Sequence, residues 1–197
     1  MSSRITFRLH TLRAHISVDS GHDSSGVSSA HDAPKCGGVS SEDGIVVLTK
    51  CGAVRGRRGD NGGLMYLGIP YAAPPVGKLR FKKPVLHDSW DTLLDCTGFR
   101  PGSLQMSDTS IPGGTDESCL YLNIWTPPQP SSFETVRRLP VYVWIHGGGF
   151  QNGAGSVDTY CGERLAADGC IVVTINYRLG ALGFLMPDGD GDANCGL

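Results

Sequence analysis

The stretch LPVYVWIHGGGF, residues 139–150, constrains the fold more than any other part of this chain. Its first half, residues 141–145, is a continuous run of β-branched and aromatic side chains with no polar alternation. Such a run is typical of a strand that is covered on both faces, so it predicts a central strand. His146 and three glycines follow directly. Because glycine lacks a Cβ, this loop can place backbone N–H groups against an oxygen that becomes negative during a reaction.

The composition and the charge favour a loop-rich enzyme. The 197 residues include 28 glycines and 12 prolines, and 40% of them are hydrophobic, which is enough to bury a core. A net charge of −2 provides no basic field, which argues against binding to nucleic acid. No apolar run approaches the roughly 18 residues of a membrane-spanning helix. No Walker loop or G-x-G-x-x-G occurs either, so we expect no cofactor.

Two groups of residues contain possible metal ligands but do not match the pattern of a metal site. The histidines and the cysteine of the N-terminal region have no zinc-ligand spacing. The acids at positions 188, 190 and 192 follow the start of a calcium-loop pattern, but Ala193 stands where that loop needs glycine. We therefore predict that the chain holds no metal ion.

Residues 1–43 are expected to lie outside the folded domain, which would span residues 44–197. Residues 1–18 carry three arginines and no acid, with apolar residues at the spacing of a helical stripe. This composition is that of an organelle transit peptide, and a variable, frayed N-terminus is the alternative. Residues 19–43 are rich in serine, glycine and aspartate and too polar to pack, so we predict a disordered linker.

The remainder reads as an α/β domain. Apolar runs between turn-forming residues predict strands at 45–48, 53–55, 64–69, 119–125, 141–145 and 170–177. Residues 160–168 predict a short helix that Gly169 ends at the C′ position. The segment 141–177 would then form a strand, helix, strand unit with two parallel strands and a right-handed crossover.

Four blocks of sequence carry a family resemblance. In order along the chain they are GIPYAAPPVGKLRFKKP (68–84), ESCLYLNIWTP (117–127), PVYVWIHGGGFQNGAGS (140–156) and IVVTINYRLGALGFL (171–185). In these blocks the chain resembles the N-terminal part of type B carboxylesterases, the esterase and cholinesterase family of the α/β-hydrolase fold. The resemblance implies an incomplete, mixed and mostly parallel sheet, and a serine-dependent hydrolysis of small carboxylic esters.

The resemblance also implies roles for four residues. In the family, the N–H groups of the second and third glycines of H-G-G-G hold the oxygen of the tetrahedral intermediate, and those positions are Gly148 and Gly149 here. Arg80 and Glu117 resemble a buried ion pair that ties the N-terminal segment to the sheet, which is a structural role. Donors of an oxyanion hole lie about 2.7–3.1 Å from the oxyanion.

The chain departs from the family pattern at the nucleophile. No G-x-S-x-G occurs in these residues, and in this fold the catalytic acid and histidine follow that elbow. We therefore expect no turnover from the 197 residues alone. An esterase-like binding or adhesion protein without catalysis, and a non-functional gene fragment, remain as alternatives. In this fold the 141–146 strand lies between the 171–177 strand and the strand that leads to the serine, so its second edge should be unpaired.

Two further departures concern loops. The family usually joins a cysteine of a P-x-C-x-Q element to the cysteine of C-L-Y-L-N, but here Ser103 takes the first position and leaves Cys119 alone. The missing bridge favours a reducing compartment, or a member that dispenses with the bridge. Members that bind choline carry a tryptophan between these elements. None occurs between Gln105 and Glu117, which argues against cholinesterase activity.

Overall fold

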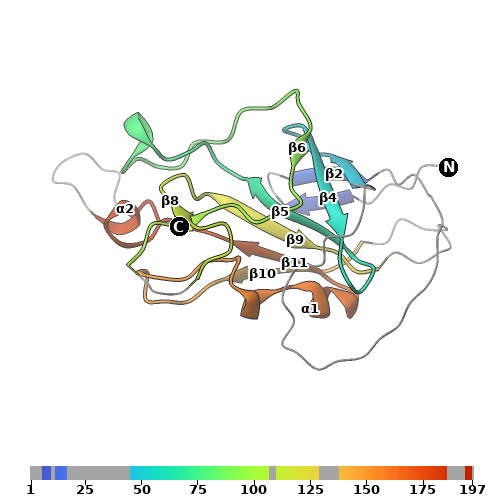
Figure 1. The fold of residues 1–197 in the computed structure, drawn as a ribbon. Helices are drawn as coiled ribbons and strands as arrows, with labels where there is room; N and C mark the ends of the chain where they lie inside the picture. Colours follow the sequence, from blue (N-terminus) through green and yellow to red (C-terminus); the bar gives the residue numbers. More distant parts are fainter. Residues whose placement is uncertain are drawn as a thin grey trace.

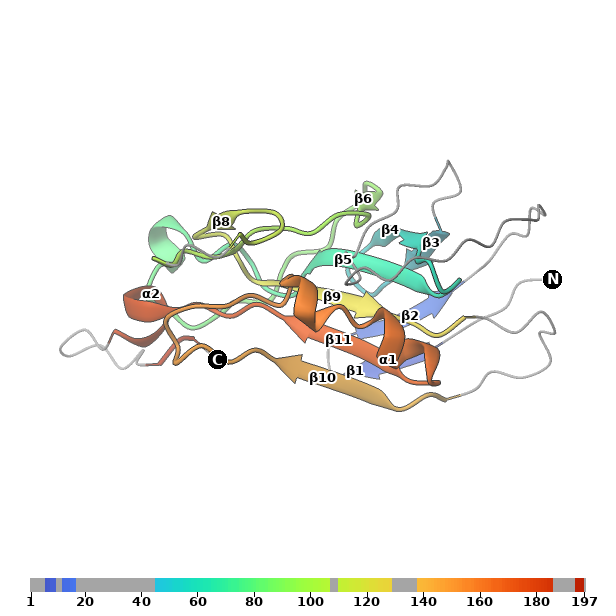
Figure 2. The ribbon, with the colours of Figure 1, turned by 60° about the horizontal axis from the view of Figure 1, so that its bottom comes forward.

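The structure is a computed structural model that describes residues 6–9, 12–16, 45–106, 110–128, 138–185 and 194–196. One nine-stranded sheet organises these residues, with its strands in the order β1-β2-β3-β4-β5-β9-β11-β10 and with β6 beside β4. Helix α1 lies against the sheet near β11 and β10, and long loops extend beyond the other strands (Figures 1 and 2).

The first part of the domain is an antiparallel meander. It consists of β3 (Ile45–Leu48), β4 (Ala53–Arg58) and β5 (Leu64–Pro70), and each strand pairs antiparallel with the next. In β3 the residues alternate between buried and exposed, with Ile45 and Val47 in the core. This period of two is what a strand with one solvated face requires. The predicted strands at 45–48 and 64–69 are confirmed, and β5 is buried along almost its whole length.

The N-terminal stretch differs from its prediction. Strands β1 (Thr6–Leu9) and β2 (Leu12–Ile16) pair antiparallel, and β2 pairs with β3. Residues 6–9 and 12–16 are therefore strands and not the helix that the apolar spacing suited. The assignment of residues 1–43 to a disordered segment or targeting peptide stays a prediction. The spacing of apolar residues suited a helix, but pairing with β3 is a tertiary contact that the spacing does not contain.

The centre of the sheet is buried on both faces. Strand β9 (Tyr121–Trp125) pairs antiparallel with β5 on one side and with β11 (Ile171–Ile175) on the other. One face of the sheet carries a cluster that includes Tyr66, Ile124 and Val173. The other face carries a cluster with Leu67, Trp125, Val172 and, from α1, Ala166. Alternate residues of the same strands therefore enter two separate cores.

Strand β10 (Val141–Ile145) pairs parallel with β11 and lies at the end of the sheet. The predicted strand is confirmed, and so is the parallel pair. The prediction of full cover is wrong for the described residues, because Val141 is 39% exposed and Ile145 is 52% exposed. No described strand pairs with the second edge of β10.

The balance of strand directions also differs from the expectation. The α/β class and the mixed sheet are confirmed, but most of the described pairs are antiparallel and the predicted mostly parallel sheet is corrected. Within the described residues, β10 with β11 and β4 with β6 (Leu94–Asp95) are parallel, and so is a separate pair formed by β7 (Gly102–Ser103) and β8 (Thr115–Asp116).

The helices are short. Helix α1 (Glu163–Ala167) follows a 3₁₀ turn, Asp158–Tyr160, and another 3₁₀ turn spans Gly77–Leu79. The predicted helix is confirmed, and Gly169 beyond it has a φ of +100°, which suits glycine at a helix end. Helix α2 (Gly180–Phe184) was not expected. It lies on the side of the molecule toward which β10 and β11 run (Figures 1 and 2).

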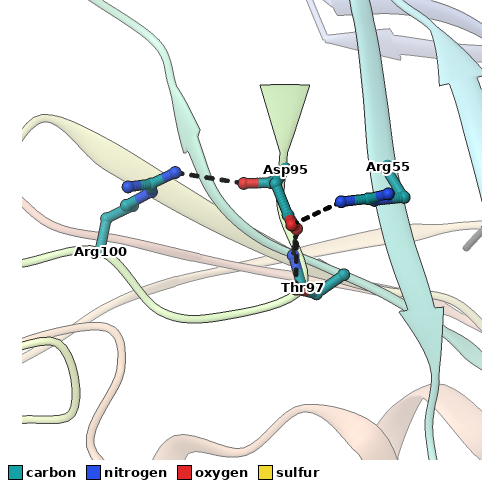
Figure 3. Close-up of polar contacts among 4 residues, drawn as sticks. All are labelled: Arg55, Asp95, Thr97 and Arg100. Atoms are coloured by element: carbon teal, nitrogen blue, oxygen red, sulfur yellow. Dashed lines mark hydrogen bonds and ion pairs between the residues drawn. The ribbon is translucent and has the colours of Figure 1, made fainter. Parts of the chain in front are cut away.

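A polar cluster fixes β6 beside β4 (Figure 3). The Asp95 carboxylate accepts hydrogen bonds from the hydroxyl and the backbone N–H of Thr97 at 2.7 and 3.0 Å. Arg55 on β4 donates to the same carboxylate at 2.7 Å, and Arg100 donates to the Asp95 carbonyl at 3.3 Å. The hydrogen bonds to the carboxylate lower the pKa of Asp95 to about 2, chiefly through the Thr97 hydroxyl and then through Arg55.

Candidate functional site

The candidate site is the glycine loop that follows β10. Gly148, Gly149 and Phe150 have φ values of +124°, +60° and +61°, so three consecutive residues lie in the left-handed region. A Cβ on Gly148 would lie 1.9 Å from the carbonyl oxygen of Asn152, so only glycine fits at this position. The phenylalanine adopts this conformation at a cost of about 1–3 kcal/mol, and such strain is typical of functional loops.

The loop closes on itself, and the N–H groups of residues 147–150 have no acceptor among the described residues. The carbonyl of Gly148 accepts hydrogen bonds from the N–H groups of Gln151 and Asn152, at 3.1 and 3.2 Å. Within the described part of the chain, the N–H groups of Gly148 and Gly149 donate no hydrogen bond. Both glycines are exposed. Two neighbouring backbone donors are therefore open to an external acceptor, at the carboxyl end of a parallel strand, where open α/β sheets bind ligands.

His146 anchors the start of the loop in the core. Its side chain is 3% exposed, and its Nδ1 lies 2.8 Å from the carbonyl oxygen of Gly147. A carbonyl only accepts hydrogen bonds, so Nδ1 carries the proton and Nε2 is the bare nitrogen. Burial lowers the pKa of His146, against the opposing effect of the Gly147 hydrogen bond, so the ring is neutral at neutral pH.

Tyr177, which lies just beyond the end of β11, contacts His146. The two rings stack with centroids 4.4 Å apart, and the Tyr177 hydroxyl donates to the His146 carbonyl at 2.9 Å. Phe150, at the far end of the glycine run, is held separately. Its carbonyl accepts the Gly180 N–H at 2.7 Å, and its ring contacts that of Phe184 with centroids 4.8 Å apart. Both ends of the glycine run are thus attached to the segment after β11.

Buried polar side chains fix the continuation of the loop at Gly155. The N–H of Gly155 donates to Oδ1 of Asn176 at 2.8 Å, and its carbonyl accepts the Thr174 hydroxyl at 2.7 Å. Asn123 on β9 donates to Thr174 at 3.0 Å and accepts the Gly68 N–H at 2.9 Å. Polar residues within otherwise apolar strands are the signal that could have pointed to this network, because a buried amide must find partners.

Arg80 and Glu117 form an ion pair. The guanidinium donates through Nε and Nη2 to the two oxygens of the Glu117 carboxylate. The side chain of Arg80 is 49% exposed and that of Glu117 is 14% exposed, so the expected buried pair is in fact half-exposed. The hydrogen bonds from Arg80 lower the pKa of Glu117. A pair this open to solvent stabilises a fold weakly.

Comparison with known proteins supplies the family. Residues 43–197 match the model of the carboxylesterase family. This chain belongs to the carboxylesterase family. Its nine-stranded mixed sheet is part of an α/β-hydrolase fold, as in the solved carboxylesterase relatives.

Named relatives are similar over most of this chain. A para-nitrobenzyl esterase of Bacillus subtilis (strain 168) is 47% identical over 147 residues, which are 71% of this chain and 29% of that protein. An acetylcholinesterase of Danio rerio is 41% identical over 174 residues, 79% of this chain and 27% of that protein. The structure of a PNB esterase matches with a TM-score of 0.68 at 45% identity, over 77% of this chain and 31% of that one. This carboxylesterase-family chain thus spans under a third of these relatives.

Two cysteines of this carboxylesterase-family chain differ in their bonding state. Cys119 is a free, fully buried thiol, and Ser103 lies beside it as a hydrogen-bond partner. Burial raises the pKa of Cys119 to about 11, so the thiol is inert at neutral pH. Cys161 is disulfide-bonded.

The remaining sequence-based expectations concern metals and membranes. The described residues contain no group of three or more histidines, cysteines or acids placed to hold a metal ion. The N-terminal histidine side chains and the acids at 188, 190 and 192 lie outside the residues whose side chains are described. No helix among the described residues has the length and apolarity to cross a bilayer.

Proposed function

We propose that this chain provides the oxyanion hole of a serine-dependent carboxylic ester hydrolase. The N–H groups of Gly148 and Gly149 would donate to the carbonyl oxygen of a small ester while that oxygen gains negative charge. The observation that carries the proposal is the absence of an internal acceptor for these two exposed amides within the described residues. Preorganised donors of this kind stabilise the transition state more than the ground state.

The mechanism divides between this chain and residues outside it. A serine hydroxyl, deprotonated by a histidine, attacks the ester carbon, and the alcohol leaves with a proton from that histidine. Water then attacks the acyl-enzyme, and the acid leaves. Since no G-x-S-x-G occurs in this sequence, the nucleophile lies outside these residues and the chain alone is not active. Gly148 and Gly149 act in both steps, because both pass through an oxyanion.

His146 has no place in the proton transfers of this mechanism. Its Nδ1–H is engaged by the Gly147 carbonyl, and the ring is buried against Tyr177. A neutral, desolvated imidazole with a lowered pKa is a poor proton carrier at neutral pH. We propose that it supports the loop, while the substrate itself is a small carboxylic ester that needs no cofactor.

Glycine variants of the protein at its natural length test the proposal. Gly148→Ala places a methyl group against the Asn152 carbonyl, so the loop must move and the two donors leave the oxyanion. We expect kcat for ester hydrolysis to fall by about 10²–10³ with a small change in KM. Gly98→Ala is the control, because a Cβ at Gly98 meets nothing within 4 Å. Equal kcat in the two variants would refute the assignment.

A fluorophosphonate probe separates the hydrolase from the binding or adhesion alternative. The reagent phosphonylates an activated serine, so the natural-length protein should be labelled with a stoichiometry near one. A folded natural-length protein that stays unlabelled and hydrolyses no ester would favour the binding alternative.

A further inference from the structure

We propose that Gln105 is a positioning residue for the oxyanion hole: its side-chain amide holds Gly153 and thereby sets the orientation of the Gly148 and Gly149 N–H groups. The inference rests on the proposed function and extends it to a residue 48 positions from the loop residue it holds. Gln105 touches neither substrate nor reacting atoms in this proposal. It acts through the backbone of the loop.

The contacts of Gln105 are reciprocal. Its Nε2 donates to the Gly153 carbonyl at 2.9 Å, and its Oε1 accepts the Gly153 N–H at 2.8 Å. The same Nε2 donates to the carbonyl of Ser103 at 3.0 Å. The side-chain amide therefore pairs with Gly153 as a neighbouring strand would, and both of its Nε2 hydrogens are used. Neither a carboxylate nor an apolar side chain of the same length can reproduce this pattern.

Gly153 transmits the restraint to the start of the loop. Its φ is +108°, and a Cβ on it would lie 2.4 Å from Nδ1 of His146 and 2.7 Å from the Gly147 carbonyl oxygen. The backbone of Gly153 is therefore in close contact with the two residues that begin the glycine run. Between these points, the Gly148 carbonyl closes the turn by accepting the Gln151 and Asn152 N–H groups. A shift of Gly153 must displace this compact turn.

Gln105 is itself attached to the core. Ser103, two residues before it, is 2% exposed, and its hydroxyl accepts the N–H of Leu179 at 3.0 Å. Leu179 follows β11, the strand that pairs with β10. The loop is thus connected to the sheet by a second set of contacts, separate from the contact of Tyr177 with His146. A misplacement of about 1 Å at a reacting centre can cost about 10²-fold in rate, so a restraint of this kind bears on turnover.

Two variants of the natural-length protein test the inference through their pH dependence. In Gln105→Glu the carboxylate faces the Gly153 carbonyl without a hydrogen to share, but the protonated carboxyl donates to that carbonyl and accepts the Gly153 N–H. In Gln105→Met no pH restores the pair. We expect both variants to lose at least tenfold in kcat at pH 7.5 with little change in KM. The ratio of Gln105→Glu to wild type should rise toward one as pH falls to about 5, because a carboxyl near a carbonyl has a pKa above its ordinary value of about 4.3.

Controls separate positioning from folding and from the proposed function. Leu104→Ala changes an exposed neighbour and should keep wild-type kcat. Wild-type kcat in both Gln105 variants, or a loss in Gln105→Glu that stays the same from pH 7.5 to 5, would overturn the inference. If wild type hydrolyses no ester, the proposed function fails, and the amide resonances of Gly148 and Gly149 decide the inference alone. They should shift in Gln105→Met and return in Gln105→Glu at acidic pH; unchanged resonances would overturn it.

Discussion

The Tyr177 hydroxyl donates a hydrogen bond to the His146 carbonyl at 2.9 Å while the two rings stack 4.4 Å apart. The segment after β11 thereby holds the first residue of the glycine loop by both a polar and an aromatic contact. Tyr177→Phe keeps the stacking and removes the hydrogen bond, whereas Tyr177→Leu removes both. We expect a loss of about 1 kcal/mol in the free energy of unfolding for the first variant. The second should lose about 3 kcal/mol or more, by analogy with other truncations of buried aromatic residues.

Urea denaturation of both Tyr177 variants measures these losses. In the natural-length protein, kcat should fall in Tyr177→Phe and fall further in Tyr177→Leu, because each variant removes more of the contacts that hold the loop. Equal stability for Tyr177→Phe and wild type would show that the hydroxyl contact contributes nothing.

The guanidinium of Arg178 is a buried charge whose three nitrogens have no partner among the described residues. The residue is 2% exposed. A buried charge without its partner costs about 3–5 kcal/mol, so Arg178→Met should stabilise the 197-residue chain. In the natural-length protein the sign should reverse if a carboxylate from outside these residues pairs with the guanidinium. Urea midpoints of wild type and Arg178→Met, measured both for the 197-residue chain and for the natural-length protein, test the two effects. If Arg178→Met destabilises the 197-residue chain, Arg178 is already paired there.

Asp95 predicts a weak acid sensitivity of stability. Its pKa is about 2 in the folded chain, against an ordinary value of 3.8, because Thr97 and Arg55 donate to the carboxylate. A carboxylate with a lowered pKa stabilises the fold above its unfolded pKa, and this contribution is lost as pH falls through the folded pKa. The loss should therefore occur between about pH 4 and pH 2. Because Asp95 is half-exposed, the effect is small.

Titration of the Asp95 carboxyl by ¹³C NMR checks the cause. Thr97→Val removes the hydroxyl donor, so the pKa of Asp95 should move toward its ordinary value, and the acid-induced loss of stability should become smaller and end at a higher pH. A pKa unchanged by Thr97→Val would assign the shift to Arg55 instead.

The elements that could be predicted from sequence are those with a local signal. The apolar run at 141–145 predicted β10, and the glycine run predicted an open loop after it, because both signals lie in consecutive residues. The cover of β10 and the direction of most strand pairs depend on which strands become neighbours, and no window of sequence contains that information. Strand β2 could not be predicted for the same reason, because its partner β3 begins far along the chain, at Ile45.

The supporting residues of the site show the same limit. Gly148 and Gly149 follow from a motif, whereas Gln105 and Tyr177 act on loop residues 48 and 31 positions away. Only the fold brings them together. Asn123, Thr174 and Asn176 gave a partial signal, because polar residues at the ends or centres of apolar strands require buried partners.

A crystal structure of the natural-length protein after reaction with a fluorophosphonate tests the oxyanion assignment most directly. The phosphonyl oxygen should lie about 2.7–3.1 Å from the backbone nitrogens of both Gly148 and Gly149. A phosphonyl oxygen held by other donors, with these two amides turned to solvent or to a carbonyl of the protein, would contradict it.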